Sequence, residues 1–297
     1  MSIEDFDATI QTLPTEPPLH FYLIADAAQD SRHPSGLTES IPDTRSQCLL
    51  TYHQGADLEA AAPHLMSFPQ FDVNAKSWQW LAGYGAAMPA AVSVIASPLN
   101  FEALFAHLHA FTEVVLPDGD EMIFAFWDPA ILGTLFGQQD DDTLHVPGPV
   151  LTSREREQFL AGMSAWWYWD RTRKIHQVVP NTGKNTGKRV SLPLRITQTQ
   201  VDMLVEASVP DHILGYIRMN KPGILSKVPD PEQYPRVEQH LQEARRLNLL
   251  GMQDIVNYVC AGIIYGSHMQ ESIEIERLLE KVRSRQISLT EALEQFP

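Results

Sequence analysis

The polar stretch NTGKNTGKR at residues 181–189 separates two parts of the chain whose apolar residues follow different periods. Before it, short apolar runs such as HFYLIADAA (20–28) and AAVSVIAS (90–97) are typical of buried β-strands. After it, apolar residues recur every three or four positions, as they do on one face of a helix. We therefore expect an α+β protein, with an N-terminal layered α/β lobe that contains a mixed sheet at 1–180, a linker at 181–191 and an all-α helical lobe at 192–297.

The stretch LPDGDEMIFAFWDPAIL at 116–132 carries the clearest local signals of the N-terminal lobe. Asp118 and Gly119 indicate a turn, and MIFAFW, which is apolar on both alternating faces, predicts a central strand covered on both sides. A helix should follow, because the capping residue Asp128 precedes a proline that fits the first helical position. The residues expected to shape this scaffold are Asp118, Gly119, Trp127, Asp128 and Pro129.

Further helices are indicated by their start signals or by their periodicity. Ser97 before Pro98 repeats the combination of a cap and a proline, and Thr152 with Glu155 has the spacing of a capping box. In the C-terminal lobe the helical period predicts about six helices, in the segments 200–207, 211–219, 237–250, 254–266, 273–285 and 289–296.

The charge of the chain limits its partners. It has 22 Lys and Arg against 37 Asp and Glu, a formal net charge of −15, which disfavours nucleic acid and anionic membranes. Cys48 and Cys260 are the only cysteines, far apart and without metal-ligand spacing, as in a reducing compartment. We find no signal-peptide pattern and no apolar run near the roughly 20 residues of a membrane helix, so we expect a cytoplasmic location.

No motif for catalysis or metal binding is complete. The 181–189 stretch fails the phosphate-loop pattern, because Thr182 and Arg189 stand where Gly and Ser or Thr are needed. The acidic run at 140–142 lacks the Gly and distal Glu of a calcium loop. We therefore expect no catalytic residue, no cofactor and no bound metal. The alternative is a hydrolase or metal-dependent enzyme that uses Asp26, at the end of the first strand, together with His20.

The order of the motifs resembles the adaptor chaperones of type VI secretion (the Tap or effector-chaperone family). The likeness rests on YLIADAAQ (22–29), PHLMSF (63–68), SPLNFEALFAHLHAF (97–111), LPDGDEMIFAFWDPAIL (116–132) and PGPV (147–150), and more loosely on EARRLNLLGMQDIVNYVCAGIIYG (243–266). Two positions depart from the family, which usually has arginine where this chain has Ala125 and Ala130.

The resemblance implies a non-catalytic adaptor. Such a protein holds a toxic effector in the cytoplasm and loads it onto the trimeric spike protein VgrG. The helical lobe would then contribute cargo specificity, and a structural baseplate component is a further alternative. Exposed Trp and Tyr are enriched at binding hot spots, and strand alternation in WWYWD (166–170) should expose two of its four rings. The candidate contact residues are Asp26, Gln29, Trp166, Trp169, Tyr216 and Tyr258.

Overall fold

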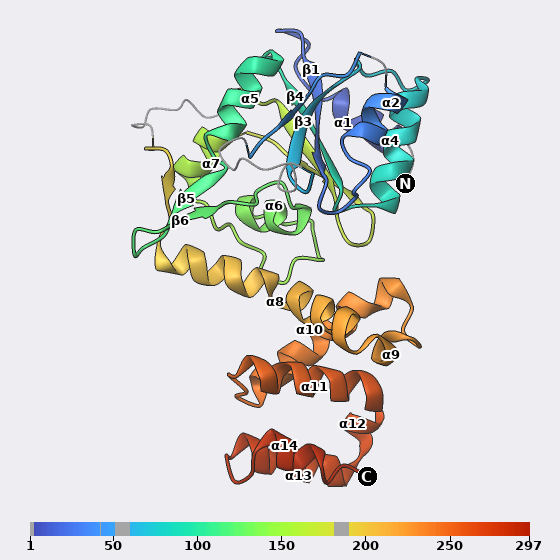
Figure 1. The fold of residues 1–297 in the computed structure, drawn as a ribbon, viewed down its shortest axis with the longest axis vertical. Helices are drawn as coiled ribbons and strands as arrows, with labels where there is room; N and C mark the ends of the chain where they lie inside the picture. Colours follow the sequence, from blue (N-terminus) through green and yellow to red (C-terminus); the bar gives the residue numbers. More distant parts are fainter. Residues whose placement is uncertain (1–2, 42, 51–59, 181–189) are drawn as a thin grey trace. The chain divides into compact units, whose positions relative to one another are not determined.

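The computed structural model describes residues 3–41, 43–50, 60–180 and 190–297 (Figure 1). It divides into two compact units, Met1–Ala207 and Ser208–Pro297. The α+β class is confirmed, because both sheets belong to the first unit and the second unit is helical. Residues 181–189 of the expected linker lie outside the described part, and the units divide after Ala207. Residues 190–207 go with the first unit because Leu194 and Ile196 are buried in its core.

The larger sheet of the first unit has six strands in the order β2-β3-β1-β4-β7-β8, and every neighbouring pair is antiparallel. The strands expected from HFYLIADAA, AAVSVIAS and WWYWD are confirmed as β1, β4 and β7. The expected mixed pairing is therefore absent from this sheet. The strands are β1 (His20–Asp26), β2 (Ser46–Cys48), β3 (Pro63–Phe68), β4 (Val92–Ser97), β7 (Ala165–Trp169) and β8 (Ile175–Val178).

Both faces of this sheet are covered by helices (Figure 1). Along β1, Tyr22 and Ile24 join one apolar core, and Phe21 and Leu23 join the other, because successive side chains point to opposite faces. The first core is closed by α5 (Phe101–His109), α6 (Pro129–Phe136) and α7 (Ser153–Phe159). The second is closed by α1 (Ile3–Ile10), α2 (Ser35–Ser40) and α4 (Lys76–Ala87).

The aromatic strand β7 shows the consequence of this double cover. Trp166 and Tyr168 fill the first core, and Trp167 and Trp169 fill the second. All four side chains are fully buried. The expectation that two of the four rings would be exposed is therefore wrong, because alternation exposes side chains only where one face of a sheet meets solvent.

The stretch MIFAFW does not form a central strand. Its strand, β6 (Glu121–Ile123), is exposed and lies at the edge of a small sheet with β5 (Glu113–Val115) and β9 (Leu194–Arg195). This sheet is mixed, because β5 is antiparallel to β6 and parallel to β9. After Ile123 the chain leaves the strand, and Phe124, Phe126 and Trp127 enter the first core. The run is apolar because an irregular segment fills the core, which periodicity cannot distinguish from a strand.

The predicted turn, the α6 cap and the α7 capping box are confirmed, and one predicted helix start is wrong. Asp118 accepts a hydrogen bond from the Asp120 N–H at 3.1 Å, and Gly119 has φ +99°, as a turn requires. Asp128 caps α6 by accepting from the Ala130 N–H at 3.0 Å, with Pro129 as the first helical residue. The capping box before α7 is also present. The helix start predicted at residue 97 is wrong, because β4 continues to that residue and α5 begins after the cap Asn100.

The second unit is built from helices around a separate core. The first two predicted helices form one helix, α8 (Gln198–Asn220), with Pro210 inside it, and α8 extends across the division between the units. Helices α10 and α11 pack closely at Gly262, where an added Cβ would lie 2.5 Å from the His240 ring. The other helices are α9 (Pro222–Leu225), α10 (Asp230–Arg246), α11 (Met252–Tyr265), α12 (His268–Glu271), α13 (Ile273–Arg283) and α14 (Leu289–Leu293).

Candidate protein-interaction surface

Asp26 is buried at the end of β1, where its Oδ1 accepts a hydrogen bond from the Ala28 N–H at 2.9 Å. Burial raises its pKa to about 6, and the nearby charge of Asp128 acts in the same direction. Gln29 is exposed in the turn that follows. Because the larger sheet is antiparallel, its strand ends do not converge on one edge in the way that makes parallel sheets form sites there.

The pair invoked for an enzyme is not brought together. His20 and Asp26 begin and end the seven-residue strand β1. At about 3.3 Å per residue, their backbones lie about 20 Å apart. One substrate group cannot contact both side chains.

Three of the aromatic contact candidates are placed where no partner can reach them. Trp166 and Trp169 are buried in the two sheet cores, and Tyr258 is buried on α11. Burial, together with the charge and hydrogen bond of Glu243, raises the pKa of the Tyr258 hydroxyl. The expectation that these three side chains are exposed is wrong, because large aromatic rings fill the interiors of both units. Tyr216, on α8, is exposed as expected.

One group of side chains in the described residues has the spacing of metal ligands: Asp141, Asp170 and His176, whose ligand atoms all lie within 4.8 Å. The hydrogen bonds that these three side chains already make decide whether the group fits a metal. His176 Nε2 lies 2.9 Å from Asp170 Oδ2, and its Nδ1 lies 3.1 Å from Asp140 Oδ2. The Tyr168 hydroxyl donates to Asp141 Oδ2 at 2.8 Å. Since each offered side chain already has a protein partner, the group fits an imidazolium paired with carboxylates better than a metal centre.

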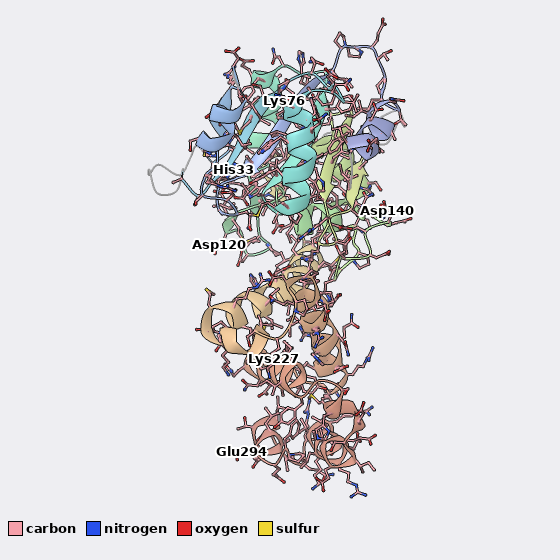
Figure 2. All side chains as sticks on the ribbon, turned by 90° about the vertical axis from the view of Figure 1, so that its right-hand side faces the viewer. His33, Lys76, Asp120, Asp140, Lys227 and Glu294 are labelled. Carbon is pink, nitrogen blue, oxygen red and sulfur yellow. The ribbon has the colours of Figure 1, made fainter. Side chains whose placement is uncertain are left out.

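The ionisation of this group follows from its geometry. Burial alone would lower the pKa of His176, but the hydrogen bond to Asp170 and the charges of Asp141 and Asp140 outweigh it and raise that pKa. Burial would raise the pKa of Asp170, but the His176 ring, the Thr172 hydroxyl and the Lys174 N–H lower it below its ordinary value. The group therefore joins the β7–β8 hairpin to the acidic loop after α6, and Asp140 of that loop lies at the surface (Figure 2).

The most exposed apolar side chains of the described residues lie in the second unit. Among the described residues, the four most exposed large apolar side chains all belong to it, with Met219 79% and Leu250 75% exposed, followed by Ile273 and Ile264. Leu250 borders a groove of about 380 Å³ between the α10–α11 and α13–α14 connections. Leu250 is therefore the exposed apolar side chain of this unit that is best placed to anchor a protein partner.

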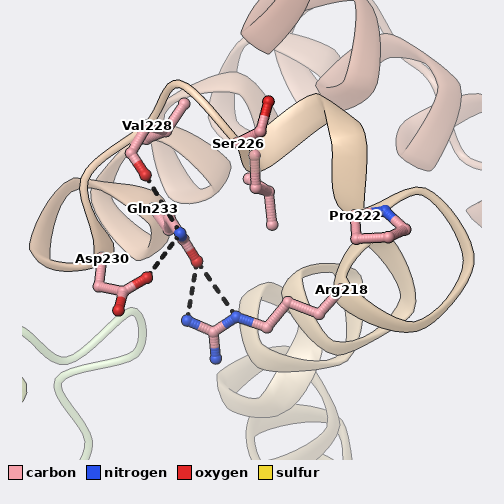
Figure 3. A pocket seen from close by; sticks show the side chains of 7 residues that line it. Arg218, Pro222, Ser226, Val228, Asp230 and Gln233 are labelled. Atoms are coloured by element: carbon pink, nitrogen blue, oxygen red, sulfur yellow. Dashed lines mark hydrogen bonds between the residues drawn. The ribbon is translucent and has the colours of Figure 1, made fainter.

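A second pocket, of about 350 Å³, lies where α8, α9 and α10 meet (Figure 3). Arg218 extends along it and donates from Nε and Nη2 to the Oε1 of buried Gln233, at 3.1 and 2.8 Å. Pro222 and Leu225 contribute apolar lining. Neither Arg218 nor Gln233 was a sequence candidate. The available signal was the segment 212–229, which has no Asp or Glu in an otherwise acidic chain.

Comparison with known proteins finds a match within the first unit. Residues 21–146 match the model of a family described as "Domain of unknown function (DUF4123)". The match runs from β1 past α6 and includes none of the second unit. This domain family is associated with adaptor function for type VI secretion effectors. No curated protein and no solved structure matches the chain. Among the described residues, no helix has the length and apolarity needed to cross a membrane.

Proposed function

We propose that this protein is a non-catalytic adaptor that binds a secreted effector in the cytoplasm and loads it onto the VgrG spike of a type VI secretion system. The observation that carries the proposal is the family match over residues 21–146, which covers β2, β3, β4 and nearly all of β1 in the larger sheet. Two of the four acids of the 116–132 stretch have structural roles in this scaffold: Asp118 supports a turn and Asp128 caps α6.

The second unit is the region that we propose to select the cargo. It lies outside the family match, as a part that differs between adaptors for different effectors would. Its exposed apolar side chains supply anchors for a partner, and they are few enough to allow release, which a loading protein requires. The first unit then supplies the scaffold common to the family.

Co-expression with a candidate effector encoded in the same gene cluster, followed by size-exclusion chromatography, tests the proposal. The full chain should elute with the effector, and residues 1–207, which retain both sheets, should not. Leu250→Asp in the full chain should weaken the complex without unfolding the protein, because the side chain is exposed. The control is Met88→Asp, which changes an exposed residue of the first unit. Leu241→Asp is not suitable as a control, because Leu241 is buried. Co-elution of the effector with residues 1–207 alone would overturn the assignment of cargo binding to the second unit.

The enzyme alternative makes a different prediction. The purified chain would turn over ester or phosphoester substrates, and Asp26→Asn would abolish that turnover in a folded protein. The separation of His20 and Asp26 along β1 favours the adaptor.

A further inference from the structure

We propose that the pocket around Arg218 binds an acidic side chain of the effector, carried on a peptide segment next to an apolar residue. This inference rests on the proposed adaptor function and names the chemistry by which the second unit recognises its cargo. The pocket lies wholly within that unit and is lined by residues of α8, α9, α10 and the α9–α10 connection (Figure 3).

The guanidinium of Arg218 is held in place by a buried amide. Gln233 donates from Nε2 to the Val228 carbonyl at 3.2 Å and to Asp230 Oδ1 at 2.8 Å. Because both donors of the amide face these oxygens, its Oε1 must face the arginine, and it accepts from Nε and Nη2. Figure 3 shows the third nitrogen of the guanidinium pointing away from Gln233. Its N–H groups, with the second N–H of Nη2, form a fork that matches a carboxylate.

The charges around the pocket favour an acidic ligand. From residue 212 to residue 229 the chain contains Arg218, Lys221 and Lys227 and no Asp or Glu. The acid that lines the pocket, Asp230, accepts a hydrogen bond from Gln233 rather than pairing with the arginine. This segment differs from the rest of the chain, which is acidic: the formal net charge is −13 for Met1–Ala207 and −2 for Ser208–Pro297. An acidic partner would be repelled by the first unit and accepted at this position.

The shape of the pocket and its apolar lining limit the ligand further. A pocket of about 350 Å³ accepts one or two side chains, and Pro222, Leu225 and Val228 give it apolar surface beside the guanidinium. A peptide that places an apolar residue next to Asp or Glu satisfies both parts. A hydrogen bond between charged groups typically contributes enough that its loss weakens binding about 10- to 100-fold.

The experiment is selection of peptides from a random library displayed on phage, with the immobilised full chain as target. Parallel selections use the wild type, Arg218→Gln, Arg218→Lys and the control Arg236→Gln, an exposed arginine of α10 that pairs with Glu232 on the same helix. The wild type and the control should enrich peptides in which Asp or Glu adjoins an apolar residue. Arg218→Gln should lose that enrichment, and Arg218→Lys should retain part of it, because it keeps the charge but not the fork. Circular dichroism should give the same helix signal for all four proteins.

An enriched peptide is then measured by fluorescence anisotropy. Its affinity should fall about 10- to 100-fold on Arg218→Gln, and by a similar factor when its acid is replaced by the amide. The proposal is overturned if no peptide is enriched, or if enrichment is the same on the wild type and on Arg218→Gln. It is also overturned if inorganic phosphate displaces the peptide while acetate at the same concentration does not, because the site would then be specific for phosphate.

Failure of this inference differs from failure of the adaptor proposal. If the effector co-elutes equally with the wild type and Arg218→Gln, the adaptor stands and the pocket is not its anchor. If no effector binds but acidic peptides bind through Arg218, the pocket is a peptide site in a protein with another function.

Discussion

Replacing His176 with leucine tests whether a buried imidazolium joins the β7–β8 hairpin to the loop after α6. The side chain is fully buried, and its two ring nitrogens face carboxylate oxygens of Asp170 and Asp140. Both nitrogens must therefore carry protons and donate. The leucine variant leaves the Asp170 carboxylate, which is only 2% exposed, without its cationic partner.

The cost can be estimated from the hydrogen bonds that remain. Removing one partner of a buried ion pair costs about 3–5 kcal/mol. Asp170 keeps three donors, the Thr172 N–H at 2.8 Å, the Thr172 hydroxyl at 2.7 Å and the Lys174 N–H at 2.9 Å. We therefore expect a loss of about 2–3 kcal/mol in the free energy of unfolding. The matched control is Asp140→Asn, which should cost no more than about 1 kcal/mol, because that carboxylate is 57% exposed.

Urea unfolding followed by tryptophan fluorescence measures these changes in the first unit. All six tryptophans lie within Met1–Ala207, so the signal does not report on the helical unit. The buried imidazolium contact is refuted if His176→Leu lowers the free energy of unfolding by no more than Asp140→Asn does.

The dependence on pH provides a second test of the same contact. The pKa of His176 is raised above its ordinary 6.5, so its stabilisation is complete below 6.5 and is lost as pH rises through the folded-state pKa. The pKa values of Asp170 and Asp140 are lowered below 3.8, so their stabilisation is complete above 3.8 and is lost as pH falls through their folded-state values. The difference in stability between wild type and His176→Leu should therefore be largest between pH 3.8 and pH 6.5. A difference that stays constant into the alkaline range would contradict the imidazolium.

Three further predictions concern single residues. The pKa of Asp26 is raised from 3.8 to about 6, so ionisation destabilises the fold as pH rises through that interval. At pH 8, urea unfolding of Asp26→Asn should give a free energy of unfolding about 1–3 kcal/mol above that of the wild type, and at pH 3 the two should be equal. Equal stability at pH 8 would contradict the burial argument. Asp128→Ala removes the cap of α6 and should cost at least about 1 kcal/mol by fluorescence-monitored unfolding, so an unchanged midpoint would show that the cap contributes little. In the helical unit, Gly262→Ala should cost about 1–3 kcal/mol by circular dichroism, because its Cβ would meet the His240 ring. The control Gly215→Ala meets no atom within 4 Å and should be neutral or stabilising, and the opposite order would refute the close α10–α11 contact.

Local signals were sufficient for the parts of the fold that depend on nearby residues. The Asp128 cap with Pro129, the Thr152–Glu155 capping box and the turn at Gly119 each depend on a few adjacent side chains and backbone groups. The change from strand period to helix period also indicated a sheet-containing part followed by a helical part. These features could be predicted because their energetics are contained in short stretches of sequence.

The structure differs from the sequence-based expectations where contacts between segments far apart in the sequence decide which residues are buried. Nothing local shows that β7 lies inside a sheet covered on both faces, so the burial of Trp166 and Trp169 could not be predicted. Leu194 belongs to the first unit because β9 pairs with β5, far away in sequence. The site residues were missed for the same reason, since Arg218 becomes a candidate only when Gln233, on another helix, holds its guanidinium.

The most direct test of the adaptor function is a loading experiment with purified VgrG and the candidate effector, with and without this protein. The effector should be recovered on VgrG only when this protein is supplied, and this protein should be present in less than equal amount in the final complex. Recovery of the effector without this protein would contradict the adaptor function, and so would stable retention of this protein in equal amount in the assembled spike.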